Sequence, residues 1–109
     1  MAHYLYMAAY TAEAWANLTK NPQNRMAAVG PVAQALGGDL EQAWLSFGEY
    51  DVVALLRLPD NGSAAAFAMA VAAGGAVKAA KTVPLLTLEE GVEAMRQAGG
   101  AGYRPPAGS

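Results

Sequence analysis

The 109-residue chain contains no cysteine, only one histidine and few charged residues. The lack of cysteine excludes disulfides, thiolate nucleophiles and cysteine-ligated zinc sites. Charged residues make up 15% of the sequence and apolar residues 54%, whereas ordinary soluble domains are about 25% charged. So little charge leaves apolar surface poorly covered, which favours a partner subunit. The net charge of −2 offers no basic surface to a nucleic acid.

The sequence also lacks a long apolar run. Its longest stretch of small apolar residues, Ala64 to Ala73, is too short to span a bilayer. The first residues lack the basic start and apolar run of a secretory signal. We therefore expect a cytoplasmic protein that binds neither membrane nor nucleic acid. The length fits one domain, which we expect over residues 1–98, followed by a mobile Gly- and Pro-rich tail over 99–109.

The apolar pattern predicts four strands and four helices. The strands are expected over residues 3–10, 39–47, 51–58 and 76–85. The helices are expected as a short segment capped by Thr11, a longer one from Asn21-Pro22 to Leu36 with a kink at Gly30-Pro31, one over 64–73, and one capped by Thr87 and Glu90. The last of these carries its apolar residues on one face.

This order of elements predicts the split βαβ, or ferredoxin-like, α+β fold: βαββαβ with one antiparallel sheet, helices on one face and an added C-terminal helix. The strands are apolar on both faces, so the sheet face without helices should not be left in water. A second copy docked sheet to sheet is the simplest cover, and burial of apolar area would drive that association. We therefore predict a homo-oligomer, with any useful cavity lying between the two sheets.

Five segments in order resemble one known family. They are Tyr4-Leu5-Tyr6-Met7 with the strand end Tyr10-Thr11, Lys20-Asn21-Pro22 to Arg25, Leu36-Gly37-Gly38, Gly48-Glu49-Tyr50-Asp51-Val52-Val53, and Pro84-Leu85-Leu86-Thr87. Together they resemble the GYD domain family, a group of small bacterial proteins. The resemblance implies a ferredoxin-like fold of the dimeric α/β-barrel type, and it implies no activity.

Tyr50 and Asp51 lie at the tip of the predicted hairpin and are the first candidates for chemistry. A phenol and a carboxylate near a cavity can bind a polar ligand or pass a proton. The structural alternative is that Asp51 bonds turn amides while the ring of Tyr50 packs. His3, the single histidine, is a candidate base, but no second ligand at a metal-binding spacing accompanies it. We therefore expect no metal site.

Aromatic residues are the second candidate feature. Tyr4, Tyr6 and Tyr10 share one face of the first strand, and Trp44 lies on a strand that is expected nearby. They either line a pocket for a planar ligand or fill the interface between two sheets. Arg25 lies near a predicted helix start and can bind an anion there, pair with an acid or remain solvated. The candidate ligand-binding residues are therefore Tyr4, Tyr6, Trp44, Tyr50, Asp51 and Arg25.

No glycine-rich phosphate loop and no convincing nucleophile set is present, and no cofactor is expected. The first functional hypothesis is a homo-oligomeric small-molecule-binding or accessory protein. The alternative is a cofactor-independent enzyme of the isomerase, cyclase or oxygenase type that uses Tyr50 and Asp51, an analogy that rests on fold alone. A third hypothesis is an interaction module that pairs with a different protein through the same sheet face.

Overall fold

The computed structural model describes residues 1–107, which form four strands and four helices. In chain order they are β1 (Ala2–Tyr10), α1 (Ala12–Lys20), α2 (Met26–Ala35), β2 (Asp39–Leu45), β3 (Val52–Leu58), α3 (Asn61–Ala73), β4 (Val77–Leu85) and α4 (Leu88–Gly99). The strands form one antiparallel sheet in the order β2-β3-β1-β4. The predicted ferredoxin-like α+β fold is confirmed. The last two residues of the predicted tail lie outside the described residues.

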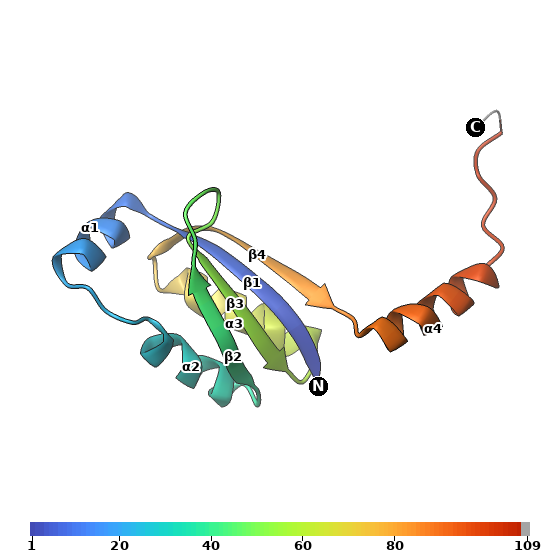
Figure 1. Ribbon diagram of the computed structural model, residues 1–109, viewed down its shortest axis with the longest axis horizontal. Coiled ribbons are helices and arrows are strands. Elements are labelled where there is room, and N and C mark those ends of the chain that lie inside the picture. Colours follow the sequence, from blue (N-terminus) through green and yellow to red (C-terminus); the bar gives the residue numbers. More distant parts are fainter. Residues whose placement is uncertain (108–109) are drawn as a thin grey trace.

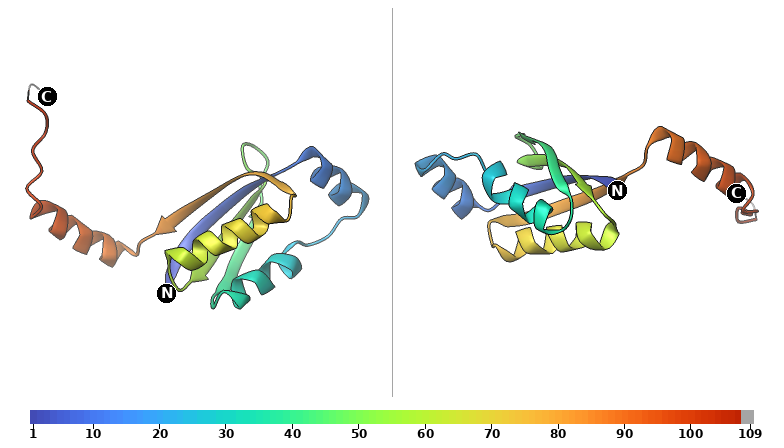
Figure 2. Two further views of the ribbon diagram at one scale, coloured as in Figure 1. Left: turned by 180° about the vertical axis from the view of Figure 1, so that it is seen from behind. Right: turned by 90° about the horizontal axis from the view of Figure 1, so that it is seen from below.

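The sheet has one covered face and one uncovered face. Helices α2 and α3 pack on the same side, α2 against β2 and α3 against β3 and β4. Figure 1 looks onto the side that neither of them covers, and the left view of Figure 2 shows α3 in front of the strands. We call the uncovered side the open face. The alternation of side chains along each strand decides which residues meet the helices and which do not.

Three helix starts follow from local sequence. The side chain of Thr11 accepts a hydrogen bond from the Ala14 N–H, and Asp60 accepts one from the Ser63 N–H. Thr87 and Glu90 complete the predicted capping box at the start of α4. These caps satisfy backbone donors that the first turn of a helix leaves free. The predicted caps Thr11 and Thr87 with Glu90 are confirmed, whereas α3 begins at Asn61, three residues before its predicted start.

The predicted helix start at Asn21-Pro22 is wrong. Asn21 is the C-cap of α1, and its N–H donates to the Asn17 carbonyl. Proline is common just after a helix end because it cannot continue the helix, and here it opens a link over residues 21–25. The second helix begins only at Met26 and runs through Pro31 to Ala35 as one element.

The core lies between the sheet and the helices and contains the tyrosines of β1. Tyr4 and Tyr6 are 2% and 3% exposed, and Leu56 and Phe67 are fully buried beside them. The rings of Tyr6 and Phe67 meet edge to face at 5.3 Å, a favoured aromatic geometry. The expectation that these tyrosines fill an interface between two sheets is therefore wrong. They lie under the helices because their strand positions alternate with those of the open face.

The start of β2 requires a residue without a side chain. A Cβ on Gly38 would lie 1.9 Å from the carbonyl oxygen of Arg57, so only glycine permits β2 to approach β3 this closely. The strand is shorter than predicted and ends at Leu45. Phe47, expected within it, lies beyond the strand and is fully exposed.

The open face carries apolar side chains from the three strands β3, β1 and β4. By register these are Leu5 and Met7, Val53 and Leu55, and Val83 and Leu85. All six are half-buried rather than buried. Polar contacts flank them at one end: His3 Nε2 lies 2.6 Å from the Glu41 carboxylate, and Arg57 forms an ion pair with Asp39 at 2.6 Å. α4 stands away from the body (Figure 1), and its extension contributes to the 58 Å long axis of the molecule.

Candidate ligand-binding site

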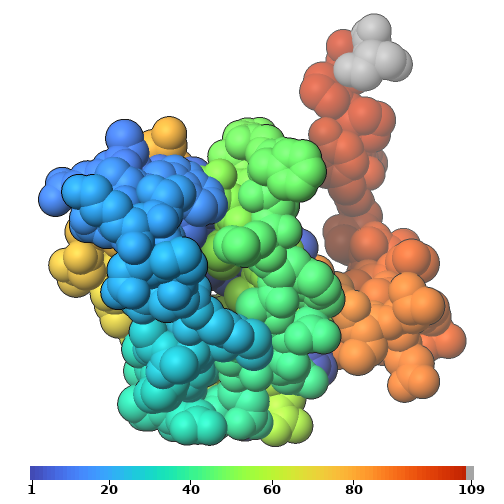
Figure 3. All heavy atoms as spheres, turned by 60° about the vertical axis from the view of Figure 1, so that its left-hand side comes forward, coloured from blue at the N-terminus to red at the C-terminus, as the bar shows by residue number. Residues whose placement is uncertain are grey.

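A cavity of about 870 Å³ lies between the sheet and the helices, on the side opposite the open face. Its floor is the covered face of β1, β2 and β3, and its walls come from α1, the 21–25 link, α2 and α3. Figure 3 shows the link lying beside β2 with a hollow between them. Most of the lining is aliphatic or aromatic, the composition typical of small-molecule sites. The expected place for a cavity was between two sheets; this one lies within a single chain.

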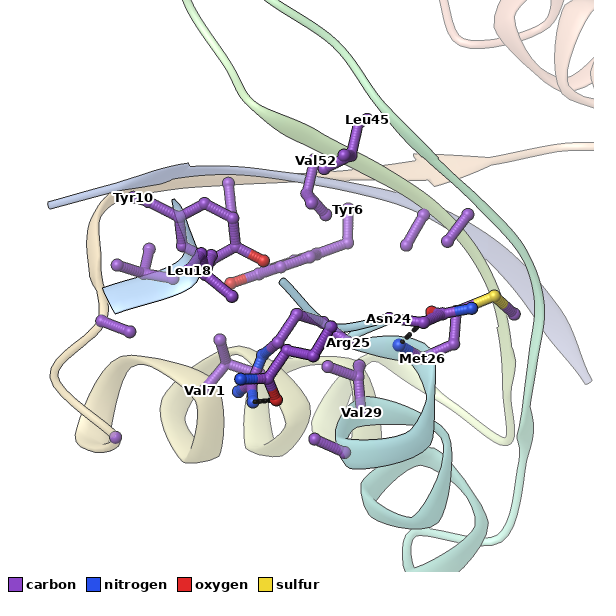
Figure 4. A pocket seen from close by; sticks show the side chains of 18 of the residues that line it. Tyr6, Tyr10, Leu18, Asn24, Arg25, Met26, Val29, Leu45, Val52 and Val71 are labelled. Atoms are coloured by element: carbon purple, nitrogen blue, oxygen red, sulfur yellow. Dashed lines mark hydrogen bonds between the residues drawn. The ribbon is translucent and has the colours of Figure 1, made fainter. Parts of the chain in front are cut away.

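Tyr6 supplies a polar group to this apolar lining. Its hydroxyl is buried and has no hydrogen-bond partner among residues 1–107. Burial, and to a smaller extent the neighbouring Tyr10 phenol, raise the pKa of Tyr6, so its hydroxyl keeps its proton and remains a donor at neutral pH. In Figure 4 the hydroxyl ends of Tyr6 and Tyr10 lie beside each other near Leu18. An unpartnered hydroxyl in such a place is costly unless something bonds to it.

The 21–25 link and the start of α2 form the outer wall of the cavity. Arg25 lies across the cavity from the two tyrosines in Figure 4. Its guanidinium makes a long contact of 3.5 Å with the Gln23 side chain. The Asn24 side chain accepts a hydrogen bond from the Met26 N–H at 2.9 Å and so fixes the turn into α2. This wall therefore carries one exposed positive charge and is otherwise neutral.

Asp51 holds three segments together. Its Oδ2 accepts hydrogen bonds from the Tyr10 N–H at 2.8 Å and from Trp15 Nε1 at 3.3 Å. Its own N–H donates to the Ala8 carbonyl at 2.8 Å. The Tyr10 and Trp15 rings meet edge to face at 5.4 Å. The carboxylate thus links the hairpin turn to the end of β1 and to α1 through its Oδ2.

The structure separates the other predicted residues. Tyr6, Trp44 and Arg25 line the cavity. Tyr4 lies outside it, and its hydroxyl donates to the Asn61 side chain at 2.7 Å. Tyr50 and His3 are not among the lining residues. Tyr50 presents its carbonyl to the Ser46 hydroxyl at 2.6 Å, within the turn.

Several lining residues escaped sequence analysis because they come from α1 and α2. Trp15 and Leu18 reach the cavity from α1, and Val29 and Val32 reach it from α2. Their apolar spacing was visible in the sequence, but such spacing equally describes residues packed in a core. These residues line a cavity, rather than a packed core, because the 21–25 link separates α1 from α2.

Residues 1–107 offer neither a metal site nor a membrane span. No group of three His, Asp or Glu side chains is placed to hold a metal ion there. Over the same part of the chain, no helix combines the length and apolar composition needed to cross a membrane.

The sheet order, the paired helices and the cavity beneath them define a ferredoxin-like α+β domain. Residues 4–95 match the model of the family described as GYD domain, so the chain belongs to the GYD domain family. Among curated proteins, none matches this chain.

Two solved structures share the fold. The protein TTHA0845 from Thermus thermophilus is 18% identical over 80% of this chain and 95% of its own, with a TM-score of 0.53. The protein FFRP-DM1 is 13% identical over 79% of this chain and 100% of its own, with a TM-score of 0.51. At these identities the two similarities concern the fold alone.

Proposed function

We propose that this chain binds a small, largely apolar molecule in the cavity between its sheet and its helices, and that it does so as a homo-oligomer. The observation that carries the first part is the unpartnered Tyr6 hydroxyl in the wall of an apolar cavity of about 870 Å³. That volume falls within the range of about 300–1,000 Å³ typical of ligand pockets.

The side chains of the cavity wall restrict the chemical class of the ligand. The Tyr6 environment raises the pKa of the phenol through burial, and the same environment disfavours a charged group on the ligand. A neutral acceptor such as a carbonyl oxygen suits a protonated hydroxyl. The Tyr6 hydroxyl oxygen is itself covered by surrounding side chains. We expect the ligand to reach it by displacing side chains of α1, because no residue of that helix is buried. We therefore expect an apolar molecule with one uncharged acceptor.

The cavity supports binding better than acid–base catalysis. None of its lining residues among positions 1–107 is Asp, Glu or His. The ionisable side chains there are two tyrosines and Arg25. The cofactor-independent enzyme hypothesis relied on Tyr50 and Asp51, and the Asp51 carboxylate is engaged by Tyr10 and Trp15. No specific observation favours that hypothesis over ligand binding.

The test compares two ligands of nearly equal shape, 2-acetylnaphthalene and 2-ethylnaphthalene, by NMR titration of backbone amide signals. In the wild type the ketone should bind a few-fold more tightly, because one neutral hydrogen bond contributes about 1 kcal/mol. Tyr6→Phe should remove the difference, and Tyr4→Phe, whose hydroxyl bonds Asn61 elsewhere, should keep it. Equal affinities in the wild type would refute the neutral acceptor. Absence of shifts at cavity residues with both compounds would refute the binding site.

Self-association is supported by the open face. Six half-buried apolar side chains lie there without a helix above them. Leu55→Lys places a charge in the middle of this face, and Met69→Lys places one on the outer side of α3, where Met69 is 69% exposed. Light scattering should give an oligomer for the wild type and for Met69→Lys, and a monomer for Leu55→Lys. A monomeric wild type at micromolar concentration would refute the proposal.

A further inference from the structure

The C-terminal helix α4 has an apolar side that nothing in its own chain covers. Leu88, Val92 and Met95 follow one another at helical spacing and are 90%, 43% and 71% exposed. We call these three residues the α4 stripe. The helix is well started by its capping box, but an isolated helix of twelve residues is marginal in water. A helix with such a stripe is stabilised mainly by packing against another surface.

The position of α4 indicates what that surface is. β4 ends with Val83 and Leu85 on the open face, and only Leu86 and Thr87 separate it from α4. In the right view of Figure 2, α4 lies beyond the end of the sheet and on the side away from α3, which is the side of the open face. A molecule docked on the open face would therefore lie next to α4. The apolar residues of β4 and those of α4 are thus separated by only a short connection in the chain.

We propose that α4 is an arm that packs against a second copy of this chain docked on the open face, and that the two copies exchange their arms reciprocally. The inference rests on the self-association proposed above. A two-fold pair is self-complementary, so each copy supplies one arm and receives one.

The available area favours this arrangement. Four strands about 4.8 Å apart and about seven residues long, at about 3.3 Å per residue, give the open face roughly 440 Å². A standard stable interface buries about 800 Å² of accessible surface on each partner. A helix of twelve residues is about 18 Å long and about 10 Å wide, so one side of it presents roughly 180 Å². Each copy would bury this area on its own α4 and a similar area where the partner's α4 packs against it. Measured as flat projections, the sheet alone gives about half of this area, and the two arms roughly double it.

The experiment measures the dimer dissociation constant of the full chain by sedimentation equilibrium. The stripe variant carries Leu88→Ser, Val92→Ser and Met95→Ser. The matched control carries Glu89→Ser, Ala94→Ser and Gln97→Ser on the other sides of the same helix. The stripe variant should raise the dissociation constant at least tenfold, and the control should change it less than threefold. Circular dichroism checks that both variants keep the sheet.

Two outcomes would contradict the proposal in different ways. A monomeric wild type overturns self-association and the arm together. A dimeric wild type whose dissociation constant is unchanged in the stripe variant overturns the arm alone and leaves the open face as the interface. Contact with the partner is checked separately with a photo-crosslinker at position 95 in dimers mixed from ¹⁴N- and ¹⁵N-labelled chains. Crosslinked peptides should pair the two isotopes; pairs confined to one isotope would show that the arm folds back on its own chain.

Discussion

Replacement of Asp51 by alanine tests whether the hairpin turn is a structural joint. The change removes the acceptor of two hydrogen bonds, from the Tyr10 N–H at 2.8 Å and from Trp15 Nε1 at 3.3 Å. Hydrogen bonds to a charged group contribute about 1.5–3 kcal/mol each. The shorter bond fits this range, and the longer bond from a partly exposed indole contributes less. We expect the free energy of unfolding to fall by about 3 kcal/mol, which lowers the melting temperature by roughly 13 °C.

The assay is urea unfolding of Asp51→Ala followed by circular dichroism at one fixed protein concentration. Glu49→Ala is the matched control, because Glu49 belongs to the same turn and its side chain is exposed; its effect should stay within about 0.5 kcal/mol. The fluorescence of Trp15 should shift as α1 loosens from the end of β1. A loss below about 1 kcal/mol with an unchanged tryptophan spectrum would refute the structural role and return Asp51 to the functional candidates.

Three other predictions follow from packing and ionisation. Gly38→Ala should cost about 3 kcal/mol or more in urea unfolding, because the new Cβ would meet the Arg57 carbonyl. Gly48→Ala, whose Cβ would meet nothing within 4 Å, should be nearly neutral, and equal effects would contradict the close approach. A hydrogen bond from the N-cap backbone N–H lowers the pKa of Glu90. Its contribution to α4 is therefore present above about pH 4.3, the usual Glu value, and is lost as pH falls through the lowered pKa. NMR helical shifts of α4 should follow this loss in the wild type and not in Glu90→Gln. Burial raises the pKa of Tyr6, so the stability linked to it is complete below about pH 10 and declines as pH rises towards the folded-state pKa. Unfolding measured at alkaline pH should show a smaller decline in Tyr6→Phe, and an identical decline would refute the assignment.

Much of the fold was predictable because its signals are local. Thr11, Asp60 and Thr87 each cap a helix with their own side chain, and the donors lie three residues ahead. Alternation along β3 separates Val53 and Leu55 from Leu56, which is fully buried. Such patterns reveal that a strand has two distinct faces, but they do not say which face meets the helices. Tyrosine suits an interface, a pocket and a core, so the sequence left the place of the β1 tyrosines open between a pocket and an interface.

The candidate site was less accessible from sequence because it depends on where α2 begins. Asn21 and Pro22 have the residue types of a helix start, and the same types also follow a helix end. In the structure Asn21 follows a helix end, because α1 continues from its Thr11 cap to Lys20. The resulting link over residues 21–25 moves α2 four residues along the chain and leaves the gap that becomes the cavity. Tyr6 and Arg25 were named as candidates, but the wall between them was not.

β1 separates two environments within the thickness of one strand. Tyr6 and Ala8 border the cavity, while Leu5 and Met7 point to the opposite side. A displacement of this central strand by an occupant on one side is transmitted directly to side chains on the other, without any hinge or long pathway. If dimer formation changes the affinity for the ligand by some factor, then ligand binding must change the dimer association constant by the same factor.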